Sequence, residues 1–152
     1  MKYLLIKLFL VLQILPSYTL YENDGTKDRD KVVMNAMKYI NTSYKTAGNS
    51  PKGFDCSGFT QYIYKDALGV RLQHGSSLQA KEGRKVKLKK AKKADLIFFK
   101  NKGRINYVGI ISKVVNNEIW VIHSTSSKGV ILEDVNNSKY WKARIAFIKS
   151  YL

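Results

Sequence analysis

The chain contains one cysteine, Cys56, and two histidines, His74 and His123, among its 152 residues. Cys56 lies in the segment GFDCSGFTQYIY, at 53–64, where apolar residues follow it at helical spacing. Free N–H groups and the positive dipole end at a helix start stabilise a thiolate. This placement predicts a solvent-reachable nucleophile that is more acidic than an ordinary thiol. The alternative is a small buried hydrophobe, a common fate of a free cysteine.

The residues beside Cys56 suit the start of a helix. Asp55 precedes the cysteine, and its carboxylate can accept from the backbone N–H groups of the first turn. We expect this helix to cover residues 56–68 and to stop at Gly69. Gly58 is expected to leave room for a substrate backbone, and the backbone N–H of Cys56 is a natural oxyanion donor.

Two further helices are predicted, one on each side of the cysteine helix. The first begins near Asp28 or Asp30 as its cap. Its apolar face consists of Val33, Met37 and Ile40. The second is short, at 76–82, where Ser76 and Gln79 form a capping-box pattern.

The spacing of apolar residues changes in the second half of the chain. Short runs of β-branched and aromatic residues, separated by turn residues, predict strands there. The runs lie at 95–100, 106–115, 118–125, 129–135 and 144–152. Because helices come first and strands afterwards, we expect an α+β domain whose N-terminal helices pack on an antiparallel β-sheet.

The first residues have the features of an export signal. Lys2 and Lys7 precede an apolar run at 8–15, and Pro16 ends it before a small-residue cleavage pattern. The run is shorter than the roughly 20 apolar residues that a membrane span needs. We expect residues 1–19 to be a signal peptide, with a buried helix or an uncleaved anchor as the alternatives. The mature protein is then secreted, periplasmic or held in the cell envelope, without a stable membrane span.

After the predicted signal peptide, the composition of the chain predicts a linker at 20–30 and one folded domain at 31–152. Hydrophobic residues make up 45% of the chain, which argues against global disorder. The net charge of +16 favours a polyanionic partner or an anionic surface. Nucleic acid is not expected, because zinc-ligand spacing, an RNP-type aromatic motif and an uninterrupted basic helix are all missing from the sequence.

The stretch 81–95, KEGRKVKLKKAKKAD, carries much of the local positive charge. It is either a solvated loop with a lysine-protected edge strand or a patch that faces a polyanion. One cysteine and two separated histidines give no metal-ligand spacing, so we expect neither a metal site nor a cofactor.

Taken in order, the motifs resemble the NlpC/P60 family of papain-like cysteine peptidases. The similarity rests on GFDCSGFTQYIY, VRLQHGSSLQAKEG, KKADLIFF, YVGIIS and IWVIHSTSSKGVILEDV, between about Tyr44 and Ile148. It implies a papain-like fold in which the cysteine heads a helix packed on the sheet. It also implies a hydrolase of D-glutamyl-diamino acid endopeptidase type, acting on peptidoglycan stem peptides. Anionic polymers attached to the wall are expected as further partners.

The resemblance also implies roles for single residues. Cys56 is the nucleophile, and His123, in VIHST, matches the polar residue that orients the base. Tyr44 matches the family's tyrosine ahead of the cysteine, although a core or lid aromatic is an equal alternative. We expect Tyr44, Asp55 and Ser57 to contact the substrate. His74 falls where the family often has an arginine or histidine, and is expected to be structural or at the substrate rim.

One position departs from the family pattern. The base of the family is a histidine immediately before Val-Gly-Ile, and here that residue is Tyr107. A phenol with a pKa near 10 is a poor acceptor for a thiol proton at neutral pH.

Three functions are compatible with this departure. Our prediction is an active peptidase with a Cys56–Tyr107–His123 arrangement, since cysteine is the nucleophile that depends least on a base. The second is a pseudoenzyme that binds cell-wall peptides without cutting them. The third is an acyl- or amide-transfer relative, because a fold does not fix a function.

Overall fold

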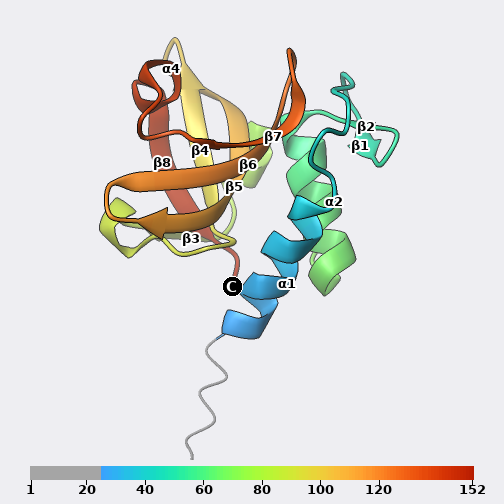
Figure 1. Ribbon diagram of the computed structural model, residues 1–152, viewed down its shortest axis with the longest axis horizontal. Coiled ribbons are helices and arrows are strands. Elements are labelled where there is room, and N and C mark those ends of the chain that lie inside the picture. Colours follow the sequence, from blue (N-terminus) through green and yellow to red (C-terminus); the bar gives the residue numbers. More distant parts are fainter. Residues whose placement is uncertain (1–24) are drawn as a thin grey trace, which may run out of the picture.

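Helices from the first half of the chain lie on one face of a sheet built from the second half (Figure 1). This computed structural model describes residues 25–152. The helical elements are α1 (Thr26–Met37), α2 (Cys56–Leu68), α3 (Ser76–Gln79), the 3₁₀ turn η1 (Leu88–Lys90) and α4 (Lys139–Lys142). The predicted signal peptide at 1–19 and the first residues of the predicted linker lie outside the described residues.

The sheet has six strands in the order β3-β8-β4-β5-β6-β7 within residues 25–152, and every neighbouring pair is antiparallel. Its strands are β3 (Arg84–Val86), β4 (Leu96–Asn101), β5 (Arg104–Val115), β6 (Glu118–Thr125), β7 (Gly129–Asp134) and β8 (Ile145–Ser150). A separate two-stranded ribbon consists of β1 (Asn49–Ser50) and β2 (Gly53–Phe54). The predicted α+β class with helices on an antiparallel sheet is confirmed.

Helix α2 has the predicted bounds, and its caps explain them. The Asp55 carboxylate accepts from the Gly58 N–H at 2.6 Å, and Gly69 leaves the helix in the left-handed region with φ 71°. The buried face of the helix packs on β5 and β6, in the apolar layer between helices and sheet. Cys56 therefore begins a helix whose position is fixed by the main core.

Gly58 has a different role from the one predicted. A Cβ atom at this position would lie 2.0 Å from the carbonyl oxygen of Gly48. The space beside Gly58 is therefore filled by the loop ahead of β1, and it is not open to a substrate backbone. The glycine allows this loop to pack directly on the first turn of α2.

Helix α1 begins earlier than predicted, at Thr26 with Gly25 as its cap. The linker expected at 20–30 is therefore wrong from Thr26 onwards. The reason is Arg29, whose guanidinium is buried and donates to the Asp95 carboxylate at 2.7 Å and to Ser150 Oγ at 2.9 Å. The predicted apolar face is right in part: Val33 and Ile40 pack partly buried against the core, but Met37 is 43% exposed. The fully buried apolar residues of the helix are Val32 and Ala36.

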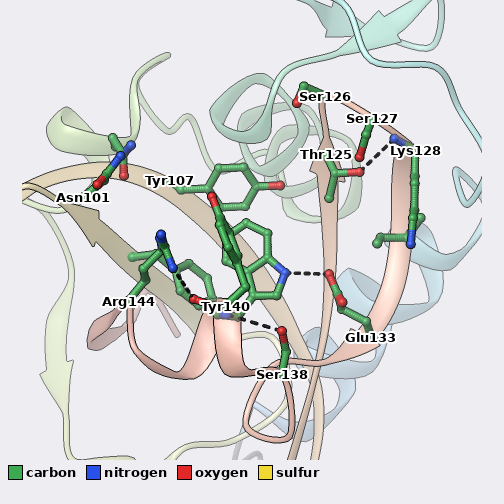
Figure 2. A pocket seen from close by; sticks show the side chains of 14 residues that line it. Asn101, Tyr107, Thr125, Ser126, Ser127, Lys128, Glu133, Ser138, Tyr140 and Arg144 are labelled. Atoms are coloured by element: carbon green, nitrogen blue, oxygen red, sulfur yellow. Dashed lines mark hydrogen bonds between the residues drawn. The ribbon is translucent and has the colours of Figure 1, made fainter.

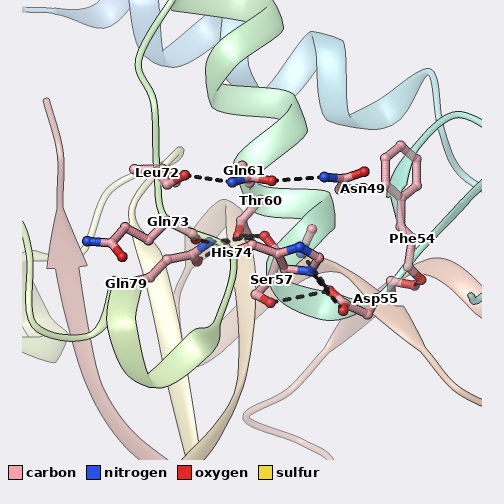
Figure 3. Close-up of polar contacts among 12 residues, drawn as sticks. Asn49, Phe54, Asp55, Ser57, Thr60, Gln61, Leu72, Gln73, His74 and Gln79 are labelled. Atoms are coloured by element: carbon pink, nitrogen blue, oxygen red, sulfur yellow. Dashed lines mark hydrogen bonds and ion pairs between the residues drawn. The ribbon is translucent and has the colours of Figure 1, made fainter. Parts of the chain in front are cut away.

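The capping box predicted for the third helix is also wrong. Gly75 is the N-cap of α3, without a side-chain hydrogen bond, and the helix ends at Gln79. The Gln79 side chain is wholly buried, where it donates to Ser57 O at 3.0 Å and accepts from Thr60 Oγ1 at 2.7 Å (Figure 3). Gln79 thus ties α3 to the first turn of α2, which supports the backbone around Cys56.

The basic stretch at 81–95 contains β3 and η1. Strand β3 is one of the two edge strands of the six-stranded sheet and pairs with β8, as the edge-strand interpretation expects; this position is also compatible with a patch that faces a polyanion. Arg84 and Lys85 on this strand discourage pairing with another chain. In the described part of the chain, no helix has the length and apolar character to cross a membrane.

Candidate active site

Cys56 is half-buried between the start of α2 and strand β5. Burial, with the negative charge of Asp55 as a smaller cause, raises the pKa of the thiol from an ordinary 9.0 to about 11. The backbone N–H groups of Val108 and Ser57 oppose this shift without cancelling it. The expectation of an acidic cysteine is therefore wrong, because desolvation exceeds the stabilisation that the helix start offers to a thiolate.

The raised pKa predicts how Cys56 reacts with an alkylating reagent. The rate should increase with pH towards a midpoint near 11, since only the thiolate reacts and about one thiol in 10⁴ is ionised at pH 7. The measurement is the rate of iodoacetamide labelling by mass spectrometry, with N-acetylcysteine as the control for the reagent. A midpoint at or below about 8.5 would contradict the buried, neutral thiol.

Tyr107, on β5, has its hydroxyl proton committed to a backbone oxygen. The hydroxyl donates to Ser124 O at 2.6 Å, and its oxygen lies 3.0 Å from Nδ1 of His123. Because a phenol carries a single proton, the Nδ1–H of His123 is the donor in the second contact. Burial raises the pKa of Tyr107, and the charges of Cys56 and Glu133 raise it further. Tyr107 in this arrangement cannot accept the thiol proton.

His123 is completely buried behind Tyr107. Its Nε2 lies 2.8 Å from Glu133 Oε1, within ion-pair distance but away from the direction of a hydrogen bond. Glu133 also accepts from Trp141 Nε1 at 2.7 Å, and contact with His123 holds its pKa below the usual value. The Trp141 ring covers the imidazole, with centroids 5.0 Å apart.

These contacts place the three predicted catalytic residues in one region but leave the thiol without a base. The charge of Cys56 acts on Tyr107, and Tyr107 contacts His123. In residues 25–152, no basic side chain hydrogen-bonds to the Cys56 thiol. Among the same residues, no three His, Cys, Asp or Glu side chains gather as metal ligands would.

Asp55 and its neighbours form a hydrogen-bonded cluster at the helix start (Figure 3). Besides Gly58 N–H, the carboxylate accepts from Ser57 Oγ at 3.2 Å and from His74 Nε2 at 2.9 and 3.0 Å. His74 therefore supports the helix cap, as a structural residue would. Ser57 is 5% exposed, so little of its surface is available to contact a ligand.

Tyr44 lies on the loop that precedes the cysteine segment. Its backbone forms an isolated bridge with Phe54, and its side chain is close enough to Tyr107 for its charge to raise the pKa of that phenol. The structure thus brings Tyr44, Cys56, Tyr107 and His123 to one site.

Glu133 and Trp141 belong to the site and were missed from the sequence. Glu133 could have been found from the hairpin: a turn at 126–128 pairs His123 with Ile131, which puts Glu133 diagonally beside the imidazole. Trp141 carries no such signal, because α4 reaches the site only through the folding of the sheet.

A pocket of about 480 Å³ opens beside Tyr107 (Figure 2). It lies on the side of the phenol that also exposes Trp141 and Glu133. Its other lining residues come from β4, β5, the β6–β7 turn and the α4 region: Phe99, Asn101, Asn106, Thr125, Ser126, Ser127, Lys128, Ile131, Ser138, Tyr140 and Arg144. A ligand in this pocket would therefore contact the Tyr107 side of the site.

Comparison with known proteins identifies the family. A model of the NlpC/P60 family matches residues 41–149, which include Cys56, Tyr107 and His123. The chain belongs to the NlpC/P60 family. The resemblance found from the motifs is thereby confirmed.

Similar proteins carry the names of hydrolases and peptidases. A γ-DL-glutamyl hydrolase of Bacillus subtilis is 32% identical over 83% of the chain, and a murein DD-endopeptidase/LD-carboxypeptidase of Escherichia coli is 33% identical over 66%. The chain spans 30% and 51% of the lengths of these two proteins.

Solved NlpC/P60 structures share the fold. The NlpC/p60 domain of the peptidoglycan hydrolase SagA is 32% identical, with a TM-score of 0.67 over 80% of this chain and 97% of that domain. A Bacillus cereus family member is 30% identical, with a TM-score of 0.73 over 82% of this chain and 40% of that protein. The predicted papain-like NlpC/P60 fold is confirmed.

Proposed function

We propose that this protein binds peptidoglycan stem peptides at the Cys56–Tyr107 site and is impaired in cleaving them. Family membership and the names of its relatives support the substrate class. One observation supports the proposed impairment. Tyr107 stands at the position that the resemblance assigns to the base, and its hydroxyl uses its only proton in a hydrogen bond to Ser124 O. The neutral, buried Cys56 thiol agrees with it.

The second candidate is an active D-glutamyl-diamino acid endopeptidase with Cys56 as nucleophile. The nearness of Cys56 to Tyr107, whose pKa its charge raises, and the contact of Tyr107 with His123 favour it. In that scheme Tyr107 takes the thiol proton while it passes its own proton to His123 Nδ1. The phenol must then leave Ser124 O, and Nδ1 must have lost the proton that it donates in the described arrangement. These two changes make the active scheme the less favoured one.

A comparison of native protein with the Cys56→Ala variant separates the two candidates. Peptidoglycan fragments are incubated with each protein, then analysed by mass spectrometry for cleavage and by calorimetry for binding. We expect fragment binding by both proteins and little or no cleavage by either. Rapid cleavage by native protein alone would establish the peptidase, and the absence of binding would remove both candidates.

We also propose that residues 1–19 are removed on export to the envelope. The proposal rests on Lys2, Lys7 and the short apolar run, which lie outside the described residues. N-terminal sequencing of the exported protein should begin near Leu20. An intact Met1 on exported, functional protein would contradict it.

A basic face formed by β3, η1 and the residues beside them, at 84–92, is proposed to contact anionic wall polymers. Its cations are Arg84, Lys85, Lys87, Lys89, Lys90 and Lys92. Asp95 is the one acid lining the same groove, and Arg29 neutralises it at 2.7 Å. Binding to walls that retain phosphate polymers should fall as salt rises and should weaken when Lys85, Lys87 and Lys89 become glutamines. Equal retention on walls stripped of these polymers would overturn the proposal.

A further inference from the structure

We infer that the pocket beside Tyr107 is a carboxylate subsite, in which Arg144 binds a free carboxylate of the peptide. This inference deepens the proposed function and rests on it, since the peptide is the one held at the Cys56–Tyr107 site. Figure 2 shows Arg144 and Lys128 on opposite sides of the pocket, with Tyr107 and Tyr140 between them. A carboxylate that enters on the Arg144 side of Tyr107 therefore meets that cation, and Lys128 acts on it only from across the pocket.

The guanidinium of Arg144 is held in place with donors unused. Its Nη1 donates to Tyr140 O at 2.7 Å, and its carbon lies 3.7 Å from the centre of the Tyr140 ring. The Nε–H has no hydrogen-bond partner within residues 25–152 but is enclosed, so the terminal Nη groups are the donors that a ligand can reach. A planar fork that is already oriented loses little freedom on binding a carboxylate, so it is well suited to this ligand.

The one carboxylate that lines the pocket does not compete for Arg144. Glu133 already accepts from Trp141 Nε1 at 2.7 Å and lies 2.8 Å from His123 Nε2. The charge of Lys128 also lowers the pKa of Glu133, so Glu133 partly neutralises Lys128 and leaves Arg144 as the cation available to a ligand. The remaining polar lining consists of neutral hydroxyl and amide groups: Asn101, Asn106, Thr125, Ser126, Ser127 and Ser138. Arg144 thus has no acidic partner in the pocket, and a ligand carboxylate can supply one.

The location of the pocket selects which part of a peptide it binds. Tyr107 lines the pocket and is near enough to Cys56 for the charge of the thiol to act on it, so a peptide that spans both places its carboxylate a short way from the bond nearest the thiol. The subsite therefore distinguishes a stem peptide with a free carboxylate on its diamino acid from one with a carboxamide at the same place. This difference is one of charge, and shape contributes little to it.

The test uses two synthetic L-alanyl-D-glutamyl-diamino acid peptides that differ in one group: the diamino acid carries a free carboxylate in the first and a carboxamide at the same place in the second. Binding of each peptide to the Cys56→Ala protein is measured by calorimetry. We expect the free acid to bind about 10–100-fold more tightly, as for a hydrogen bond to a charged group. Arg144→Met should remove the preference and Arg144→Lys should keep part of it. Lys142→Ala, on exposed α4 outside the pocket lining, should leave the preference unchanged.

Each other outcome is informative. Equal binding of the two peptides by the parent protein, or a preference that survives in Arg144→Met, would overturn the subsite and leave the proposed function standing. Binding of neither peptide would remove the proposed function and the subsite with it. Urea unfolding of Arg144→Met, compared with its parent, identifies loss of fold, and in that case the partial preference expected of Arg144→Lys decides the question.

Discussion

Replacing Tyr107 by histidine is expected to increase cleavage of stem peptides by about 10²–10⁴-fold, the usual contribution of a positioned acid–base group. The new imidazole would lie on β5 next to Val108, whose N–H faces the Cys56 thiol. On its other side it would have His123, now free of the Tyr107 hydroxyl. A neutral imidazole accepts a proton near pH 7, which the buried phenol does not.

The gain should belong to the imidazole, and loss of the phenol alone should not produce it. Tyr107→Phe is the matched control: it removes the hydroxyl, leaves Ser124 O without its donor and should give no gain. Tyr107→His combined with Cys56→Ala should be inactive. If native protein cleaves quickly and Tyr107→His slows it, Tyr107 is part of a working relay and the impairment proposed above is wrong.

Replacing Arg29 by methionine is expected to lower the free energy of unfolding by about 3–5 kcal/mol, because it leaves the Asp95 carboxylate buried without its cation. Asp95 is 1% exposed, and after the change it keeps the backbone N–H of Lys92 at 2.9 Å. The measurement is urea unfolding at neutral pH. Arg29 also joins α1 to the end of β8 through its hydrogen bond to Ser150, so the substitution removes a second link between this helix and the sheet.

An exposed ion pair in the same helix provides the control. Lys31 Nζ lies 2.9 Å from Asp28, with both side chains about half exposed. Lys31→Met should therefore change the free energy of unfolding by less than about 1 kcal/mol. If Arg29→Met lowers the free energy of unfolding by less than about 1 kcal/mol, the expectation is wrong and Asp95 has found another partner. In that case, adding Asp95→Asn to Arg29→Met should not change the free energy of unfolding further.

The sequence by itself determined the fold class, the family and the position of Cys56 at the head of α2. These follow from local signals: Asp55 as a cap, Gly69 as a stop, and apolar periods that change from helix to strand. The same local reasoning failed where a distant partner intervened. Arg29 extends α1 because Asp95, 66 residues away, is buried beside it, and Gln79 leaves its capping pattern for Ser57 O.

Only the tertiary structure decided the chemistry of the site. The sequence predicted an acidic thiol from the helix start, yet packing of α2 on β5 desolvates Cys56 and raises its pKa to about 11. The sequence identified Tyr107 as an unusual residue, but it did not show that the Tyr107 hydroxyl donates its hydrogen bond to Ser124 O. Protonation states depend on burial and on donors that folding brings together from distant parts of the chain. Local spacing in the sequence does not contain that information.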